Sequence, residues 1–430
     1  MTSESIDLVR PSAPPLTETL PRWRTKGSRA LQVGRREVLA GLVGAFALMP
    51  ESISFAVVAG LNPLVGVLTA ATMAIATSVL GGRPALVSGA AGSVALVVAP
   101  LVHQHGLSYL WSTLILAGVL QIAAGLGGVA RLLRRLPRSV ITGFVNALAI
   151  LILSAQLPNL THVAWPTYAL TAMGLGLVVL IPRWVRPVPA PLIAIIAVTS
   201  VSELCHLQVV TLGQKGDLAH WTFPHPAFPH LPWSGSVIAT VVPYAVAVAA
   251  VGLLESLMTA QLVDEWTATS SSKARECCGQ GAANIITSFF GGMGGCAMIG
   301  QTVINLRSGG RTRLSSFTAG VAILVFATLV KGQLSQVPMA ALAAVMIVVA
   351  ATTFDRDSIR PSRLRQTSWA DRIALIVTVA STVATSDLAI GVVAGVLAYA
   401  TTSRLQRGTG GWFSEPEHGE APRVELPVDR

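Results

Sequence analysis

Residues 289–310 read FFGGMGGCAMIGQTVINLRSGG, a stretch in which glycines interrupt an otherwise apolar sequence. A second stretch at residues 81–100, GGRPALVSGAAGSVALVVAP, has the same character. Each leads into an apolar segment that is shorter than the roughly 20 residues a full transmembrane helix needs. A pair of short, glycine-interrupted segments at matching positions in two halves of a chain is typical of membrane transporters built as inverted repeats.

The composition around these stretches is that of an integral membrane protein. Of the 430 residues, 52% are apolar and 12% are charged, and the mean hydropathy is +0.64. A soluble domain carries about 25% charged residues, so this chain lacks the polar surface that would keep it in water. Apolar runs of roughly 17–25 residues recur along nearly the whole length, without the alternation of a β-barrel. We therefore predict an all-α polytopic protein in the lipid bilayer.

About fourteen spans are predicted, seven on each side of a loop rich in Pro, His and Trp. The first seven lie at about 38–60, 62–80, 91–103, 109–128, 137–157, 165–181 and 187–205. The second seven lie at about 236–262, 274–290, 297–306, 313–331, 336–354, 371–385 and 387–404. In each group the third span is short and follows the glycine-rich break, which predicts a 7+7 inverted repeat.

Each short span is expected to begin near the bilayer midplane with its N-terminus facing a cavity. The unpaired N–H groups and the positive end of the helix dipole suit an anion there. The alternative is that the glycines only let helices pack closely, but it does not explain why both breaks fall third in their half.

The distribution of Lys and Arg sets the predicted orientation, because basic loops prefer the cytoplasm. Basic clusters lie in the N-terminal tail and at 131–138, 183–186, 307–313 and 356–372. The predicted parts are a cytoplasmic tail at 1–36, repeats at 37–205 and 236–404, an extracytoplasmic loop at 206–235 and a cytoplasmic tail at 405–430. We expect the cell (inner) membrane as the location and assign the net charge of +10 to this topology rather than to nucleic-acid binding.

No metal or cofactor is predicted. The four cysteines, Cys205, Cys277, Cys278 and Cys296, show no CxxC or zinc spacing and are interpreted as small apolar residues. An intramembrane enzyme is disfavoured because the sequence has neither an HExxH nor a GxGD motif. His220, His225 and His230 are five apart and would allow a metal site, but a Pro-rich loop is stiff without one.

Glu51 is the first candidate functional residue. It follows Pro50 in GLVGAFALMPESISFAVVAG at 41–60, roughly 20 Å into the first span. An ionisable side chain at that depth is costly and usually marks an ion or proton pathway. Burial disfavours the ionised form of a carboxylate, so we expect Glu51 to hold a proton near neutral pH. The alternative is a carboxylate satisfied locally by Ser52 or Ser54.

Glu255 is the second buried carboxylate, in VGLLESLMTAQL at 251–262. It lies in the eighth span, which corresponds to the first span under a seven-plus-seven repeat. Glu51 and Glu255 are therefore expected to face one central site and to carry coupled protons. For Glu255 the local alternative is a hydrogen bond from Ser256 or Thr259.

Four stretches of the chain resemble the sulfate permease (SulP) family of anion transporters. They are PESISFAVVAGLNPLVGVLTA (50–70), LPRSVITGFVNALAILILSAQL (136–157), GLLESLMTAQLVDE (252–265) and GQGAANIITSFFGGMGGCAMIGQTVINLRSGGRTRLSS (279–316). The resemblance, which covers about residues 36–404, implies a core domain and a gate domain, a homodimer and an elevator motion of core against gate. It also implies a substrate site formed by Glu51, Phe55, Ala91, Gly92, Ser93, Gly300, Gln301 and Thr302.

Two positions depart from the pattern of this family. Many members have Gln at position 51 and Arg at position 301, where this chain has Glu51 and Gln301. An ionised Glu51 would repel an anion and a protonated one would not, so binding of anion and proton should be coupled. The hypothesis is proton–anion symport of a dicarboxylate such as fumarate, or of sulfate.

Several alternatives stay open at this point. A nucleobase:proton symporter has the same expected architecture, and an anion channel or exchanger could use the same broken-helix site. Members of the family usually continue into a cytoplasmic STAS domain, and only a short polar tail follows Arg404 here. The sequence therefore leaves open whether this member lacks that domain.

Overall fold

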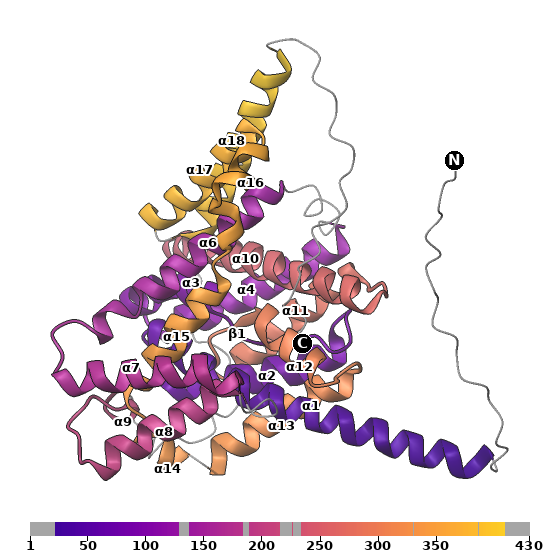
Figure 1. The fold of residues 1–430 in the computed structure, drawn as a ribbon. Coiled ribbons are helices and arrows are strands. Elements are labelled where there is room, and N and C mark those ends of the chain that lie inside the picture. The colour runs from indigo at the N-terminus through magenta and orange to yellow at the C-terminus, as the bar shows by residue number, and fades with distance from the viewer. Residues whose placement is uncertain are drawn as a thin grey trace, which may run out of the picture.

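The computed structural model describes residues 22–128, 137–183, 189–215, 226, 234–329, 331–385 and 387–408. Within these residues the protein is almost entirely helical (Figure 1). Five of its helices are long and apolar enough to cross a membrane, and five shorter helices are also apolar. The prediction of an all-α polytopic membrane protein is confirmed. The residues His220, His225 and His230 of the loop, and most of both terminal tails, lie outside the described residues.

Seven described helices form the first half of the chain. They are α1 (Arg22–Val58), α2 (Pro63–Leu80), α3 (Gly92–His105), α4 (Leu107–Leu126), α6 (Arg138–Ser154), α7 (Trp165–Leu180) and α8 (Ala190–Leu204). A short strand, β1 (Ser88–Ala90), precedes α3. Each helix corresponds to one predicted span.

Seven longer helices of the second half repeat this order. They are α10 (Gly235–Thr267), α11 (Lys273–Phe289), α12 (Ile299–Arg307), α13 (Arg313–Leu329), α15 (Met339–Thr353), α17 (Trp369–Thr385) and α18 (Leu388–Gly408). The strand β2 (Gly295–Ala297) precedes α12, as β1 precedes α3. Short helices connect some of these elements: α9 (Leu212–Lys215), α14 (Lys331–Leu334) and α16 (Pro361–Gln366).

The first helix is longer than its predicted span at 38–60. It begins at Arg22, inside the segment 1–36 that was expected to be a tail. The first residues of α1, RWRTKGSRALQ, include many Arg, Ala, Leu and Lys residues, which are strong helix formers although they are too polar to suggest a membrane span. Hydropathy therefore finds only the part of the helix that is apolar.

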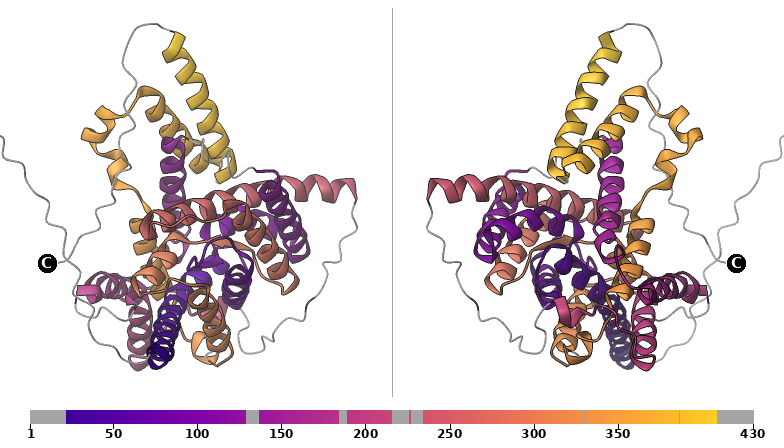
Figure 2. Two further views of the ribbon diagram at one scale, coloured as in Figure 1. Left: turned by 90° about the vertical axis from the view of Figure 1, so that its right-hand side faces the viewer. Right: turned by 90° about the vertical axis from the view of Figure 1, so that its left-hand side faces the viewer.

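The helices pack in two groups. One group holds α1–α4 and α10–α13, with close packing of α11 on α4 and of α13 on α2 and α1. The other holds α6–α8, α15, α17 and α18, with α17 packed on α18 and α6, and α15 on α7. Figure 2 shows α17 and α18 projecting from one end of the molecule, away from the first group. These two groups are the candidates for the core and gate that the resemblance implies.

The two glycine-rich breaks meet as a pair of short strands. β1 and β2 are antiparallel, with Gly89 opposite Cys296 and Ala90 opposite Gly295. The strands approach so closely that a Cβ on Gly295 would lie 1.9 Å from the carbonyl oxygen of Gly89. Glycine is needed at position 295 because of this approach, and the pairing satisfies backbone groups that would otherwise be unpaired inside the protein.

Side chains from neighbouring helices fix this strand pair. Asn284 in α11 accepts a hydrogen bond from the N–H of Gly295 at 2.9 Å and donates one to its carbonyl oxygen at 3.1 Å. Thr302 in α12 accepts a hydrogen bond from the N–H of Val87 at 3.0 Å, and the N–H of Met298 donates to the Val87 carbonyl oxygen at 3.0 Å. The starts of α3 and α12 are therefore held in one fixed arrangement.

Buried charges hold the loop between α2 and β1. Glu276 is fully buried and accepts hydrogen bonds from the N–H groups of Gly82 at 2.7 Å and Arg83 at 3.0 Å. Arg83 in turn forms an ion pair with Asp264 at 3.1 Å, and Lys273 approaches the same carboxylate at 2.8 Å. Asp264 lies near the end of α10 and joins this cluster because the loop that carries Arg83 folds back onto that helix.

Candidate functional site

Glu51 lies on α1, one residue after Pro50, and faces a cavity of about 270 Å³. The α-helix continues through Pro50 to Val58. The neighbouring hydroxyls do not hold the carboxylate, because Ser52 donates to the Leu48 carbonyl oxygen and Ser54 to that of Pro50, both at 2.9 Å. The local alternative considered for Glu51 is therefore not what the structure shows.

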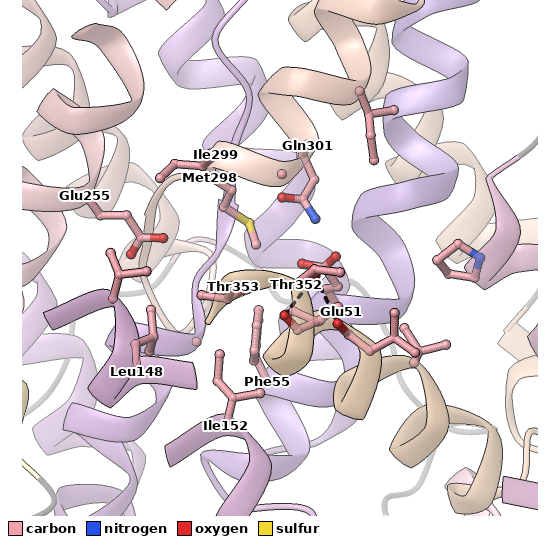
Figure 3. A pocket seen from close by; sticks show the side chains of 18 of the residues that line it. Glu51, Phe55, Leu148, Ile152, Glu255, Met298, Ile299, Gln301, Thr352 and Thr353 are labelled. Atoms are coloured by element: carbon pink, nitrogen blue, oxygen red, sulfur yellow. Dashed lines mark hydrogen bonds between the residues drawn. The ribbon is translucent and has the colours of Figure 1, made fainter. Parts of the chain in front are cut away.

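Gln301 is the group that approaches Glu51. It lies in the first turn of α12, and its side chain is buried. Its amide points toward the Glu51 carboxylate across the cavity in Figure 3. Many members of the family that the sequence resembles have Arg at position 301. Gln301 is neutral, so it adds no positive charge to the cavity.

Glu255 lies on α10 and is held by two buried side chains. The Ser93 hydroxyl, in the first turn of α3, donates to the Glu255 carboxylate at 2.6 Å, and the Cys296 thiol in β2 donates to it at 3.1 Å. Ser256 and Thr259 do not reach the carboxylate: Ser256 accepts the Ala297 N–H, and Thr259 donates to backbone carbonyl oxygens. Glu255 is thus fixed by residues from the breaks rather than by its own helix.

Cys296 had been interpreted as a small apolar residue, and that interpretation was wrong for this cysteine. Its thiol is fully buried and hydrogen-bonded to Glu255. All four cysteines are free thiols, and Cys277 is also buried. The contact could not be predicted from the sequence, because Cys296 and Glu255 are 41 positions apart and only tertiary packing brings them together.

The two carboxylates are arranged in a crossed pattern. Glu51 lies on the first helix of the first half and meets Gln301 in the broken helix of the second half. Glu255 lies on the first helix of the second half and meets Ser93 in the broken helix of the first half. Figure 3 shows the two glutamates on opposite sides of the cavity, with Phe55 and Met298 between them.

The remainder of the cavity wall is mostly apolar. Residues from both helix groups contribute, including Phe144, Leu148, Ile152, Val345 and Val348 from the second group. Thr352 and Thr353 add two hydroxyls at the end of α15. Among the described residues that line the cavity, none is a Lys, Arg or His. Sequence reasoning missed the residues from α6 and α15 because they resemble any membrane-facing apolar residues.

The structure separates the eight residues expected at the site into two sets. Glu51, Phe55, Gly92, Gly300 and Gln301 line the cavity, together with Glu255. Three lie behind its wall: Ala91, Ser93 and Thr302 are fully buried, and none of them is among the lining residues. Their contacts described above explain the difference, because Ser93 holds Glu255 and Thr302 holds Val87 while Ala91 precedes the first turn of α3.

Known proteins give independent information on this chain. Its sequence matches the model of the Sulfate permease family over residues 35–164 and 158–378. The protein YbaR of Bacillus subtilis (strain 168), which is named for sulfate transport, is 46% identical over 363 residues, covering 84% of this chain and 75% of YbaR. The bicarbonate transporter BicA of Picosynechococcus sp. is 25% identical over 358 residues, covering 75% of this chain and 62% of BicA.

Two solved structures have a similar fold. The transmembrane domain of a cyanobacterial bicarbonate transporter BicA matches with a TM-score of 0.74 and 23% identity, covering 85% of this chain and 97% of that domain. The murine Solute Carrier 26 family member A9 anion transporter, in its inward-facing state, matches with a TM-score of 0.74 and 19% identity, covering 86% and 68% of the two chains. At these identities the similarity is one of fold.

Proposed function

The chain belongs to the sulfate permease family, and we propose that it is a secondary active transporter that carries an anion across the membrane together with protons. Membership of a transporter family agrees with the expectation that the chain is not an enzyme. The observation that carries the proposal is the cavity itself: two helix starts and two glutamates face it, and no cationic side chain lines it among the described residues.

Counting charges supports proton coupling. Each helix N-terminus acts as roughly half a positive charge, so α3 and α12 together contribute about +1. Glu51 and Glu255 contribute −2 when both are ionised, which leaves the cavity negative and repels an anion. One proton makes the cavity about neutral, and two make it positive. Anion and protons are therefore expected to favour one another's binding, as linkage requires.

The same two helix groups support an elevator motion. The group with α1–α4 and α10–α13 carries both glutamates and both helix starts, and the group with α6 and α15 supplies an apolar wall. An apolar wall forms few directional contacts and suits sliding, whereas the side chains that hold Glu255 lie within the first group. We propose that this first group is the moving core and that the second group is the gate.

For the substrate we propose a dicarboxylate such as fumarate, or sulfate. Both are small enough for a cavity of about 270 Å³, and both need charge compensation that protons would supply. Relatives named for sulfate and for bicarbonate transport support an oxyanion or carboxylate more than a nucleobase. We also propose an inner-membrane location with both termini in the cytoplasm, and a homodimer.

Uptake by the purified protein in liposomes tests this function. We expect labelled fumarate or sulfate to accumulate when protons are more concentrated outside, and to equilibrate only slowly without the gradient. Excess uracil should not compete. If the anion accumulated to the same level with and without the proton gradient, the proposed coupling would be overturned. Unitary currents would indicate a channel, and competition by uracil would indicate a nucleobase carrier.

Ser93→Ala is expected to change the pH dependence of transport without unfolding the protein. The variant removes the 2.6 Å hydrogen bond to Glu255, and a bond to a charged group contributes about 1.5–3 kcal/mol. Because the ionised form of Glu255 loses this donor, we expect protons to bind more readily and the pH dependence of uptake to shift by about one unit or more toward higher pH. Ser78→Ala is the matched control, because Ser78 is also buried and its hydroxyl donates to the Ile75 carbonyl oxygen of its own helix. Identical kinetics for the two variants would contradict the role of Ser93.

A further inference from the structure

Gly300 differs from the other glycines at the site. It lies in the first turn of α12, lines the cavity and is exposed to it. A Cβ built on Gly300 would meet no atom within 4 Å. The other site glycines have close neighbours: a Cβ on Gly92 would lie 2.6 Å from the Phe55 ring, and one on Gly295 would lie 1.9 Å from a backbone oxygen.

The fold does not require glycine at position 300. The residue lies in regular α-helix, and its φ is not in the left-handed region that favours glycine. Alanine is more favourable than glycine inside a helix, because glycine loses more backbone freedom on folding. Neither packing nor backbone conformation therefore explains the missing side chain. The remaining explanation for glycine at position 300 is the open space that the absence of a side chain leaves in the cavity.

The starts of α3 and α12 also differ in whether protein side chains cover them. At α3, the Phe55 ring covers Gly92, and the adjacent Ser93 hydroxyl is bonded to Glu255, an internal carboxylate. At α12, no side chain covers Gly300. The open end of the cavity is thus the one at α12, where a bound anion can approach the backbone without displacing protein atoms.

We propose that Gly300 is a specificity-determining residue, and that the open space beside it receives part of the transported anion and sets the largest anion that the cavity accepts. This inference rests on the proposed transport of an anion through the cavity. A methyl group at position 300 occupies that space, so it excludes a long substrate such as fumarate before it excludes a short one with the same headgroup, such as formate. Gly92 has no such role, because its space is filled by Phe55.

The test compares Gly300→Ala with Gly176→Ala. Gly176 lies in α7, does not line the cavity, and likewise leaves open space within 4 Å of a Cβ. For each purified protein, the melting temperature is measured with and without formate, sulfate and fumarate, and liposome uptake of labelled formate and fumarate is compared. Thermal stabilisation reports anion binding without requiring proton coupling.

For Gly300→Ala we expect a melting temperature equal to or above that of the wild type without anion. We expect the ratio of fumarate to formate uptake to fall by about tenfold or more, since one added methyl group changes discrimination by that order, with loss of the thermal shift by fumarate. Gly176→Ala should keep the wild-type ratio. The role of Gly300 would be overturned if the ratio of fumarate to formate uptake stayed unchanged. It would also be overturned if a stable variant lost uptake of both anions equally. A wild-type protein that neither binds nor carries any of these anions would instead refute the proposed function.

Discussion

Glu51→Gln is expected to abolish proton-driven accumulation of the anion while it leaves downhill uptake measurable. Glutamine has the shape of the protonated glutamate but cannot release the proton, so the charge at position 51 no longer changes during transport. A gradient of one pH unit is equivalent to about 1.4 kcal/mol per proton, and two units drive accumulation of about a hundredfold for one coupled proton. We expect that factor to fall to about one in the variant.

Glu265→Gln is the matched control for this change. Glu265 lies near the end of α10, where its side chain is exposed and away from the cavity. Labelled uptake is followed in liposomes with and without an inward proton gradient of about two pH units. The control should accumulate the anion as the wild type does. If Glu51→Gln still accumulates the anion in response to the gradient, Glu51 is not the coupling site and Glu255 becomes the main candidate.

Gly295→Ala is expected to prevent the protein from reaching a stable native state. The added Cβ would lie 1.9 Å from the Gly89 carbonyl oxygen, and this neighbour is backbone of the paired strand rather than a flexible side chain. Asn284 holds Gly295 on both its N–H and its carbonyl oxygen, so the strand has no direction in which to move without breaking buried hydrogen bonds. We expect a loss of about 3 kcal/mol or more in the free energy of unfolding.

The measurement is thermal unfolding of the purified protein, combined with size-exclusion chromatography to detect aggregation. Gly176→Ala is again the control, because its Cβ would meet no atom within 4 Å. We expect a wild-type profile for the control and little or no monodisperse protein for Gly295→Ala. A melting temperature close to that of the wild type would mean that the two strands are not paired as described.

The order of the helices and the two breaks could be predicted from the sequence because both depend on local amino-acid composition. Apolar length marks the spans, and clustered glycines mark the places where a helix cannot continue. The start of α1 at Arg22 was missed because its first turns are helical without being apolar. The pairing of β1 with β2 was missed because three-residue strands such as SGA and GCA show no alternation.

The contents of the site were only partly predictable, for a different reason. Glu51 and Glu255 stand out because a carboxylate inside an apolar span is unusual. The side chains that hold Glu255 come from elsewhere in the chain, from α3 and β2, and such long-range contacts depend on tertiary packing. The apolar wall from α6 and α15 has no distinctive sequence at all.

The strand pair between the two halves restricts the conformational changes that are open to the protein. Hydrogen bonds across β1 and β2 connect the start of α3 to the start of α12. These two helix starts therefore cannot separate while an anion is bound. Any rearrangement that switches the opening from one side of the membrane to the other must carry them as one piece. In the proposed elevator motion, the two helix starts would therefore contact the anion in the same way on both sides of the membrane.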